Sequence, residues 1–305
     1  MFDFPDKMMK VFKNDSLQEE FEKNGYVIVP FYNQEDIDEL INLYAELHPV
    51  DETGFFPSTF SQDKQYRNTA DQEIRRIGLK RIQELCEDFK VVCGSFIVKF
   101  PGPKSIMNVH QDMTLVDESK YTGINIWCPL IDLNESNGSL WILPGSHRLF
   151  PTYRGSTIPD IYEKVKDEII ACMSPLFLKA GQAVIFDQSV IHYSPPNESN
   201  EKRIVTNTYF THKEAAFRIA YFNREVSQDQ VEVFEQDDSF MTDFEQFGEN
   251  IFDRPKIGKS LGLKDYNFPA ITVDQLKEKY GYQEAPNGGF NFKSIISRFK
   301  EIISK

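Results

Sequence analysis

The sequence has few cysteines and no long apolar run, and these two features argue against disulfide-rich and membrane-spanning proteins. The four cysteines among 305 residues are widely spaced and form no Cys-x-x-Cys pair. Each lies beside or inside an apolar run, so we expect reduced residues of the core rather than a disulfide framework or metal ligands. No apolar run reaches the ~18 residues of a membrane span, and the N-terminal residues contain no apolar signal core. These absences predict a cytoplasmic protein with no membrane span.

Positive charge is also scarce. The chain has 34 lysines and arginines against 47 aspartates and glutamates, which gives a formal net charge of -13. A surplus of this sign repels phosphate backbones, so nucleic acid is not an expected partner. A chain of this length can bury a sizeable core without added cross-links, as a monomer or a homodimer.

Residues 1–90 are predicted to be mostly helical. Ser16 begins a capping-box pattern for a short helix, and a brief apolar strand follows at 26–30. Asn33 is the expected cap of a second helix, and an apolar stripe predicts a third helix over 71–89. The sequence therefore predicts a helical N-terminal flank.

From residue 91 the apolar pattern changes to a period of two, which is typical of strands. The predicted strands are 92–100, 123–130, 139–143, 176–178, 183–186, 190–193 and 204–210. Turn residues separate them. Seven or eight short strands of this kind favour a jelly-roll or a barrel, in which the inward faces line a cavity.

The chain after residue 212 is acidic and rich in phenylalanine, and its class stays open. At its end, apolar residues at helical spacing predict an amphipathic helix over 292–305, which docks on the protein's own core or contacts a partner or membrane. We expect the flank 1–90 and the extension 213–305 to pack on a core of residues 91–212 within one domain.

The five histidines include two that suit a metal site. On an extended segment, residues two apart project to the same face, so His110 and Asp112 can hold one ion. His192, much later in the chain, is the candidate third ligand. Two histidines and one carboxylate bind Fe(II) and leave positions open for a co-substrate and dioxygen, whereas a structural zinc site wants a fourth protein ligand. Taken alone, the His-x-Asp pattern also suits a solvated histidine followed by a turn aspartate.

Arg203 strengthens the metal hypothesis. It lies at the start of the predicted strand that follows His192, where its guanidinium can grip the distal carboxylate of a dicarboxylate. Ser194 lies two residues after His192, so on an extended segment its hydroxyl can donate to the same ligand. A lone arginine is usually solvated or paired at the surface, but these neighbours favour an anchor for a co-substrate.

Four motifs in this order and spacing resemble those of a known family. They are FEKNGYVIVP at 21–30, HQD at 110–112, NGSLWILPGSH at 137–147, and HYS at 192–194 followed by Arg203. Through them the chain resembles the phytanoyl-CoA dioxygenase family of Fe(II)- and 2-oxoglutarate-dependent oxygenases. The resemblance implies a mainly β fold with flanking helices: a double-stranded β-helix (jelly-roll, cupin-like) core with a helical N-terminal flank.

The resemblance also implies a role for each matching residue. His110, Asp112 and His192 are the implied iron ligands and catalytic residues, and Arg203 is the implied anchor of 2-oxoglutarate. Further co-substrate contacts are implied or suggested for Ser194, Trp127, Asn125, Lys99 and Gln111. Core packing is the alternative for Trp127, a surface position is the alternative for Lys99, and Gln111 can face substrate instead.

The implied activity is hydroxylation with Fe(II), 2-oxoglutarate and dioxygen. The substrate would be an unactivated C–H bond of a small molecule or of a carrier-linked acyl or amino-acid group, with release of succinate and CO2. Asp112 argues against the family's halogenating relatives, which have a small residue in place of the metal carboxylate. The alternatives are a catalytically silent metal- or ligand-binding barrel of the same fold, and a zinc hydrolase, for which no general base is evident beside His110 or His192.

Two segments are candidate lids over the site, 54–60 and 213–224, because loops often overhang pockets. Arg67, Arg75 and Arg76 lie near or on the predicted third helix. They either favour an anionic group on the substrate or form a solvated helix face.

Overall fold

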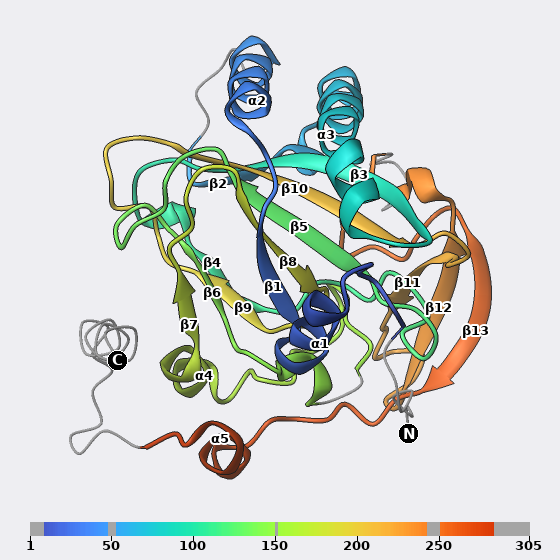
Figure 1. Ribbon diagram of the computed structural model, residues 1–305. Helices are drawn as coiled ribbons and strands as arrows, with labels where there is room; N and C mark the ends of the chain where they lie inside the picture. Colours follow the sequence, from blue (N-terminus) through green and yellow to red (C-terminus); the bar gives the residue numbers. More distant parts are fainter. Residues whose placement is uncertain (1–8, 48–52, 150–151, 243–250, 284–305) are drawn as a thin grey trace.

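The computed structural model describes residues 9–47, 53–149, 152–242 and 251–283. The helix predicted at 292–305 lies outside these residues. Three antiparallel sheets form the body of the molecule, with helices on the outside (Figure 1).

Two sheets face each other and form the core. The six-stranded sheet consists, in spatial order, of β1 (Tyr26–Pro30), β8 (Gln182–Asp187), β5 (Ile124–Pro129), β10 (Arg203–His212), β3 (Phe89–Lys99) and β2 (Phe55–Pro57). The four-stranded sheet consists of β4 (Met107–His110), β9 (His192–Ser194), β6 (Leu140–Ile142) and β7 (Ser174–Leu176). Trp127 and Val184 of the first sheet share one buried cluster with Leu140 and Ile142 of the second. The predicted jelly-roll core is confirmed, as two sheets and not as a closed barrel.

The first helix starts earlier than its expected cap. In α1 (Asp15–Asn24) the side chain of Asn14, not that of Ser16, accepts a hydrogen bond from the N–H of Leu17 at 3.0 Å. An asparagine oxygen satisfies an orphan amide as well as a serine oxygen does, and Asn14 is the residue with extended backbone. The prediction that Ser16 caps this helix was wrong.

The next two helices also depend on side-chain caps. Before α2 (Gln34–Leu47), Asn33 and Asp36 exchange hydrogen bonds with each other's N–H groups, so the predicted cap at Asn33 is confirmed. The third helix, α3 (Lys64–Leu85), begins before the predicted residue 71 because the Asp63 carboxylate accepts from the N–H groups of two following residues.

Helices α2 and α3 cover the outer face of the six-stranded sheet, at the top of Figure 1. Leu40 and Ile74 from these helices lie in one buried cluster with Ile126 and Cys128 of β5. Because side chains alternate along a strand, Trp127 projects from the opposite face of β5, toward the four-stranded sheet. The helices therefore leave the inner face of the sheet free to form a site.

The region after the core contains a third sheet that the sequence left open. It comprises β11 (Phe217–Tyr221), β12 (Gln230–Gln236) and β13 (Lys259–Asp265), on the right of Figure 1. Phe217 and Ile219 of β11 pack in one cluster with Val92 of β3 and Tyr209 of β10. On the outer face of the four-stranded sheet lie α4 (Lys166–Cys172) and α5 (Val273–Tyr280).

The cysteines fit the predicted reduced core. All four are free; Cys86, Cys93 and Cys128 are buried, and Cys172 is half-buried. Within the described ranges, no helix has the length and apolar character needed to cross a membrane.

Candidate metal and co-substrate site

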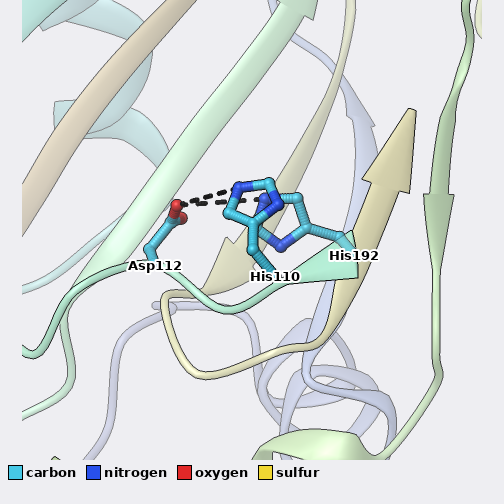
Figure 2. A group of neighbouring side chains, drawn as sticks. All are labelled: His110, Asp112 and His192. Carbon is cyan, nitrogen blue, oxygen red and sulfur yellow. Dashed lines mark ion pairs between the residues drawn. The ribbon is translucent and has the colours of Figure 1, made fainter. Parts of the chain in front are cut away.

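Three side chains converge where the two strands β4 and β9 pair. His110 ends β4 and His192 begins β9, and the two residues are partners in the antiparallel register, so their ring centroids lie only 4.0 Å apart. Asp112 follows in the loop after β4, and its carboxylate points toward both rings (Figure 2). Its Oδ1 lies 3.7 Å from His110 Nε2 and 3.9 Å from His192 Nε2. One potential ligand atom from each residue lies within 4.8 Å of the other two.

Main-chain carbonyls fix how both imidazoles present their nitrogen atoms. His110 Nδ1 lies 2.8 Å from Asn108 O, and His192 Nδ1 lies 2.9 Å from Val190 O. Because a carbonyl only accepts hydrogen bonds, each Nδ1 carries the proton, and each Nε2 offers a lone pair toward Asp112. A second hydrogen-bond partner of this kind is typical of metal-bound histidines.

Burial favours the uncharged form of the histidine that metal binding requires. Burial, and then the neighbouring His192, lower the pKa of His110 well below its ordinary value. Burial raises the pKa of Asp112, and His192 opposes that shift. Two neutral imidazoles and one carboxylate form the donor set that holds Fe(II) with positions left open.

A second feature of the site is a pair of buried basic side chains. Arg203 of β10 and Lys99 of β3 are partners in the strand register, and both are almost inaccessible to solvent. The Arg203 guanidinium lies 5.1 Å from the ring of Trp127 and donates from Nη1 to Gly138 O at 3.0 Å, but its buried Nε has no partner. Burial lowers the pKa of Arg203 to about 9.

Lys99 is buried and is not on the surface. Its ammonium donates to the main-chain carbonyls of Ser194, at 2.8 Å, and Pro195. Burial, and then Arg203, lower the pKa of Lys99 to about 5. Among the described residues neither Lys99 nor Arg203 forms an ion pair with a carboxylate. Burying a charged side chain without a counter-charge is costly.

One cavity of about 300 Å³ joins the triad to the two cations. All nine residues predicted for the site line it: His110, Gln111, Asp112, Asn125, Trp127, His192, Ser194, Arg203 and Lys99. Among the described residues that line it, the Asp, Glu, Lys and Arg side chains are Asp112, Lys99 and Arg203. The cavity thus brings the three potential metal ligands and the two buried basic side chains into one space.

Comparisons with known proteins show the family of the chain. The family model described as "Phytanoyl-CoA dioxygenase (PhyH)" matches residues 21–205. The chain belongs to this family. Phytanoyl-CoA dioxygenase domain-containing protein 1 of Danio rerio is 29% identical over an alignment of 138 residues, and the match covers 41% of this chain and 47% of that protein. The phytanoyl-CoA dioxygenase of Arabidopsis thaliana is 24% identical over 241 residues, covering 60% of this chain and 83% of the relative.

The match to the zebrafish relative spans less than half of that protein's length. Among solved structures, HygX from Streptomyces hygroscopicus with nickel and 2-oxoglutarate bound aligns with a TM-score of 0.50 at 13% identity, covering 66% of this chain and 88% of HygX. At that identity the likeness concerns the fold. This family member therefore has an oxygenase fold, with the donor set for iron at its centre.

Three of the predicted co-substrate contacts have protein partners in this phytanoyl-CoA dioxygenase family member. The Ser194 hydroxyl donates to Gly138 O at 2.9 Å, and the Gln111 amide donates to Ser189 O. Asn125 donates from Nδ2 to Asp112 Oδ2 at 2.7 Å. This last bond occupies Oδ2 and leaves Oδ1 on the side of the histidines, so Asn125 orients the triad carboxylate.

The two predicted lids have different outcomes. Phe55, Pro57, Thr59 and Phe60 line the cavity, so segment 54–60 overhangs it as predicted. No residue of 213–224 lines the cavity, because β11 belongs to the third sheet. Met241, from a later part of the chain, does line the cavity.

The arginines near the third helix do not reach the cavity. Arg67 is buried and donates to the main-chain carbonyls of Ser61, at 2.5 Å, and Thr242, at 3.2 Å, so its assignment to a solvated helix face or to an anionic substrate group was wrong. Arg75 pairs with Asp71, while Arg76 pairs with two glutamates.

Sequence reasoning missed several residues of the site. Asn207 lines the cavity and donates to Asn125 Oδ1 at 2.9 Å, and Tyr209 lines it as well. Both share the strand parity of Arg203, which is the signal that could have found them. Met113 and Leu115 follow Asp112 in a loop, where no periodic pattern indicates direction.

Proposed function

We propose that this protein is an Fe(II)- and 2-oxoglutarate-dependent dioxygenase that hydroxylates an unactivated C–H bond. The substrate is a small molecule or a carrier-linked acyl or amino-acid group. One oxygen atom of dioxygen enters the substrate as hydroxyl, and the other enters succinate as 2-oxoglutarate loses CO2. Fe(II), 2-oxoglutarate and dioxygen are the required partners.

The observation that carries this proposal is the joint lining of one cavity by the triad and the cation pair. A metal-binding protein without catalysis has no need of a buried guanidinium with an unpartnered Nε in the same cavity as its metal ligands. A dicarboxylate that reaches from Arg203 and Lys99 toward the triad would satisfy both cations. Charge-assisted bonds from a planar guanidinium suit this task.

Each residue has a defined part in the proposed reaction. His110, Asp112 and His192 would hold the iron, which when bound couples oxidation of the co-substrate to oxidation of the substrate. Arg203 would bind the distal carboxylate of 2-oxoglutarate, with Trp127 as the wall behind its guanidinium. Ser194, Lys99 and Gln111 are proposed as further contacts in the same cavity, and Asn125 as the group that orients Asp112.

The remaining cavity walls favour an apolar substrate group. They are formed by uncharged side chains, including Phe55, Phe60, Met107, Met113, Leu115 and Met241. Burying an unpaired charge against such walls is costly, whereas burying apolar surface is favourable. We therefore propose that the part of the substrate which enters the cavity is uncharged.

The experiment that tests the function measures succinate formed from 2-oxoglutarate under ¹⁸O-labelled dioxygen, in the presence of Fe(II). The wild type should release succinate with one labelled oxygen atom. Candidate substrates that increase the yield of succinate should have an uncharged group that carries the C–H bond. Asp112→Ala should abolish the labelled product, while Asp132→Ala, at an exposed carboxylate, should not. Metal binding without any labelled succinate would instead indicate a silent binding protein.

A further inference from the structure

Asp112 is the triad member that no strand holds. The strand β4 ends before it, and residues 111–115 have no regular secondary structure. Three hydrogen bonds fix it: its N–H donates to Gln188 O at 3.0 Å, its carbonyl accepts from Arg154 Nε at 2.7 Å, and its Oδ2 accepts from Asn125 at 2.7 Å. The place of this carboxylate therefore depends on side chains outside the triad.

Arg154 ties the loop that carries Asp112 to a second loop. It is 7% exposed, and its two terminal nitrogen atoms donate to the two carboxylate oxygens of Glu118, one of them at 2.9 Å. Its main chain also pairs with Thr114: Thr114 N–H donates to Arg154 O at 3.0 Å, and Arg154 N–H donates to Thr114 Oγ1 at 2.9 Å. The guanidinium is therefore held by Glu118 at its two terminal nitrogen atoms and by the Asp112 carbonyl at Nε.

The same network reaches the segment that leads to the third ligand. Glu118 Oε1 also accepts from Gln188 Nε2 at 2.6 Å, and Gln188 lies in the turn between β8 and β9, just before His192. Gln188 is fully buried, and its Oε1 accepts from the hydroxyl of Tyr209 at 3.1 Å. Arg154, Glu118 and Gln188 therefore connect the loop of Asp112 with the turn before His192.

A buried arginine–glutamate pair is weak evidence for stability by itself, because desolvation of both charges offsets much of their attraction. Here, however, the third nitrogen of the guanidinium, Nε, donates to the main-chain carbonyl of Asp112, which is one of the triad residues. We propose that Arg154, held in place by Glu118, is a positioning residue of the metal site, which keeps Asp112 Oδ1 on the side of His110 and His192. This inference rests on the proposed function, because it requires the triad to bind metal.

The test is the Co(II) affinity of the full chain, measured by titration of the visible absorption of the bound ion, with the thermal midpoint measured alongside. Arg154→Met should raise the Kd for Co(II) about 10- to 100-fold, as expected when an outer partner of a metal ligand is lost. Glu118→Gln, which keeps the side-chain shape, should raise it in the same direction. The matched control is Arg254→Met: Arg254 forms a similar two-oxygen pair with Glu232 on the third sheet, so the Kd should not change.

The double variant at Arg154 and Glu118 should bind Co(II) no more weakly than the weaker single variant, because both side chains act through one contact. Wild-type Co(II) affinity in Arg154→Met and Glu118→Gln, even with a lower thermal midpoint, would show a merely structural pair and overturn the proposal. If Arg154→Met does not fold, Glu118→Gln decides between these outcomes. A wild type that binds no Co(II) would overturn the proposed function as well, whereas tight binding by every variant overturns this inference alone.

Discussion

Individual charges in the cavity have few partners within the protein. Within the part of the chain that the structure describes, the buried Arg203 has an Nε without a partner, and the Lys99 side chain donates to two main-chain carbonyls. Leaving such groups without a counter-charge is unfavourable in a buried site, unless a ligand supplies it. Under the proposed function, a dicarboxylate supplies this counter-charge.

Replacing the arginine should separate co-substrate binding from metal binding. In Arg203→Ala the Kd for 2-oxoglutarate should rise about 10- to 100-fold, because a charge-assisted hydrogen bond contributes about 1.5–3 kcal/mol. The Kd for Co(II) should stay near the wild-type value, since Arg203 is not a triad residue. Isothermal titration of each ligand measures both quantities.

The neighbouring exposed Lys202 provides the control, because Lys202→Ala removes a nearby cation that does not line the cavity. Equal weakening of Co(II) and 2-oxoglutarate in Arg203→Ala would contradict the anchor role and indicate general damage to the site.

Among the elements, the junction of α1 with β1 packs against the short helix η3 (Ser146–Arg148). Gly25 ends α1 with a φ of 79°, and a Cβ there would lie 2.5 Å from His147 Nδ1, so only glycine fits. His147 is buried and donates from Nε2 to Glu22 O at 3.2 Å. Burial, and then Arg148, lower the pKa of His147 to about 4.

This junction should make folding sensitive to acid. Because the folded pKa of His147 lies below its ordinary value of 6.5, the unfolded chain binds the extra proton more tightly. The free energy of unfolding is unaffected by this group above pH 6.5 and decreases as the pH falls from 6.5 toward 4. The decrease reaches about 2 kcal/mol at about pH 5. Urea unfolding at about pH 7 and about pH 5 should show a smaller loss of stability in His147→Gln than in the wild type. The same loss in both proteins would refute this origin of the pH dependence.

For the whole molecule, the proposed division into a flank 1–90, a core 91–212 and an extension 213–305 implies one folding unit. Leu40 and Ile74 of the flank pack on the core sheet, and Phe217 of the extension packs on Tyr209. The urea transitions should therefore be single for all spectroscopic signals. Two separate transitions would contradict this proposal.

Local periodicity explains how much of this architecture could be predicted. The strand at 26–30 and the alternation along β5 follow from apolar patterns, and so does the shared face of Asn125 and Trp127. The strand β4 was missed because only one of its four residues is buried, and β13 was missed because its residues are mostly exposed; neither gives an apolar alternation. Short or solvated strands depend on their neighbours more than on their own sequence.

The candidate site also contains residues that the sequence could predict and residues that it could not. His110 and Asp112 could be predicted together, because residues two apart on an extended segment face the same side and their types suit a metal. Arg203 could be predicted from its place in the strand after His192 and from the family resemblance. Arg154 and Glu118 could not, because their pairing depends on how two loops meet, and loops carry no periodic signal. The supporting network around Asp112 is therefore a property of the assembled fold.

The measurement that tests the central claim most directly is the visible spectrum of the anaerobic protein with Fe(II) and 2-oxoglutarate. If the triad binds iron and the co-substrate chelates it, a weak metal-to-ligand charge-transfer band should appear with both components present and be lost in Asp112→Ala. Removal of the metal with a chelator should abolish the band in the wild type. Bound iron without this band in the wild type would contradict the oxygenase account.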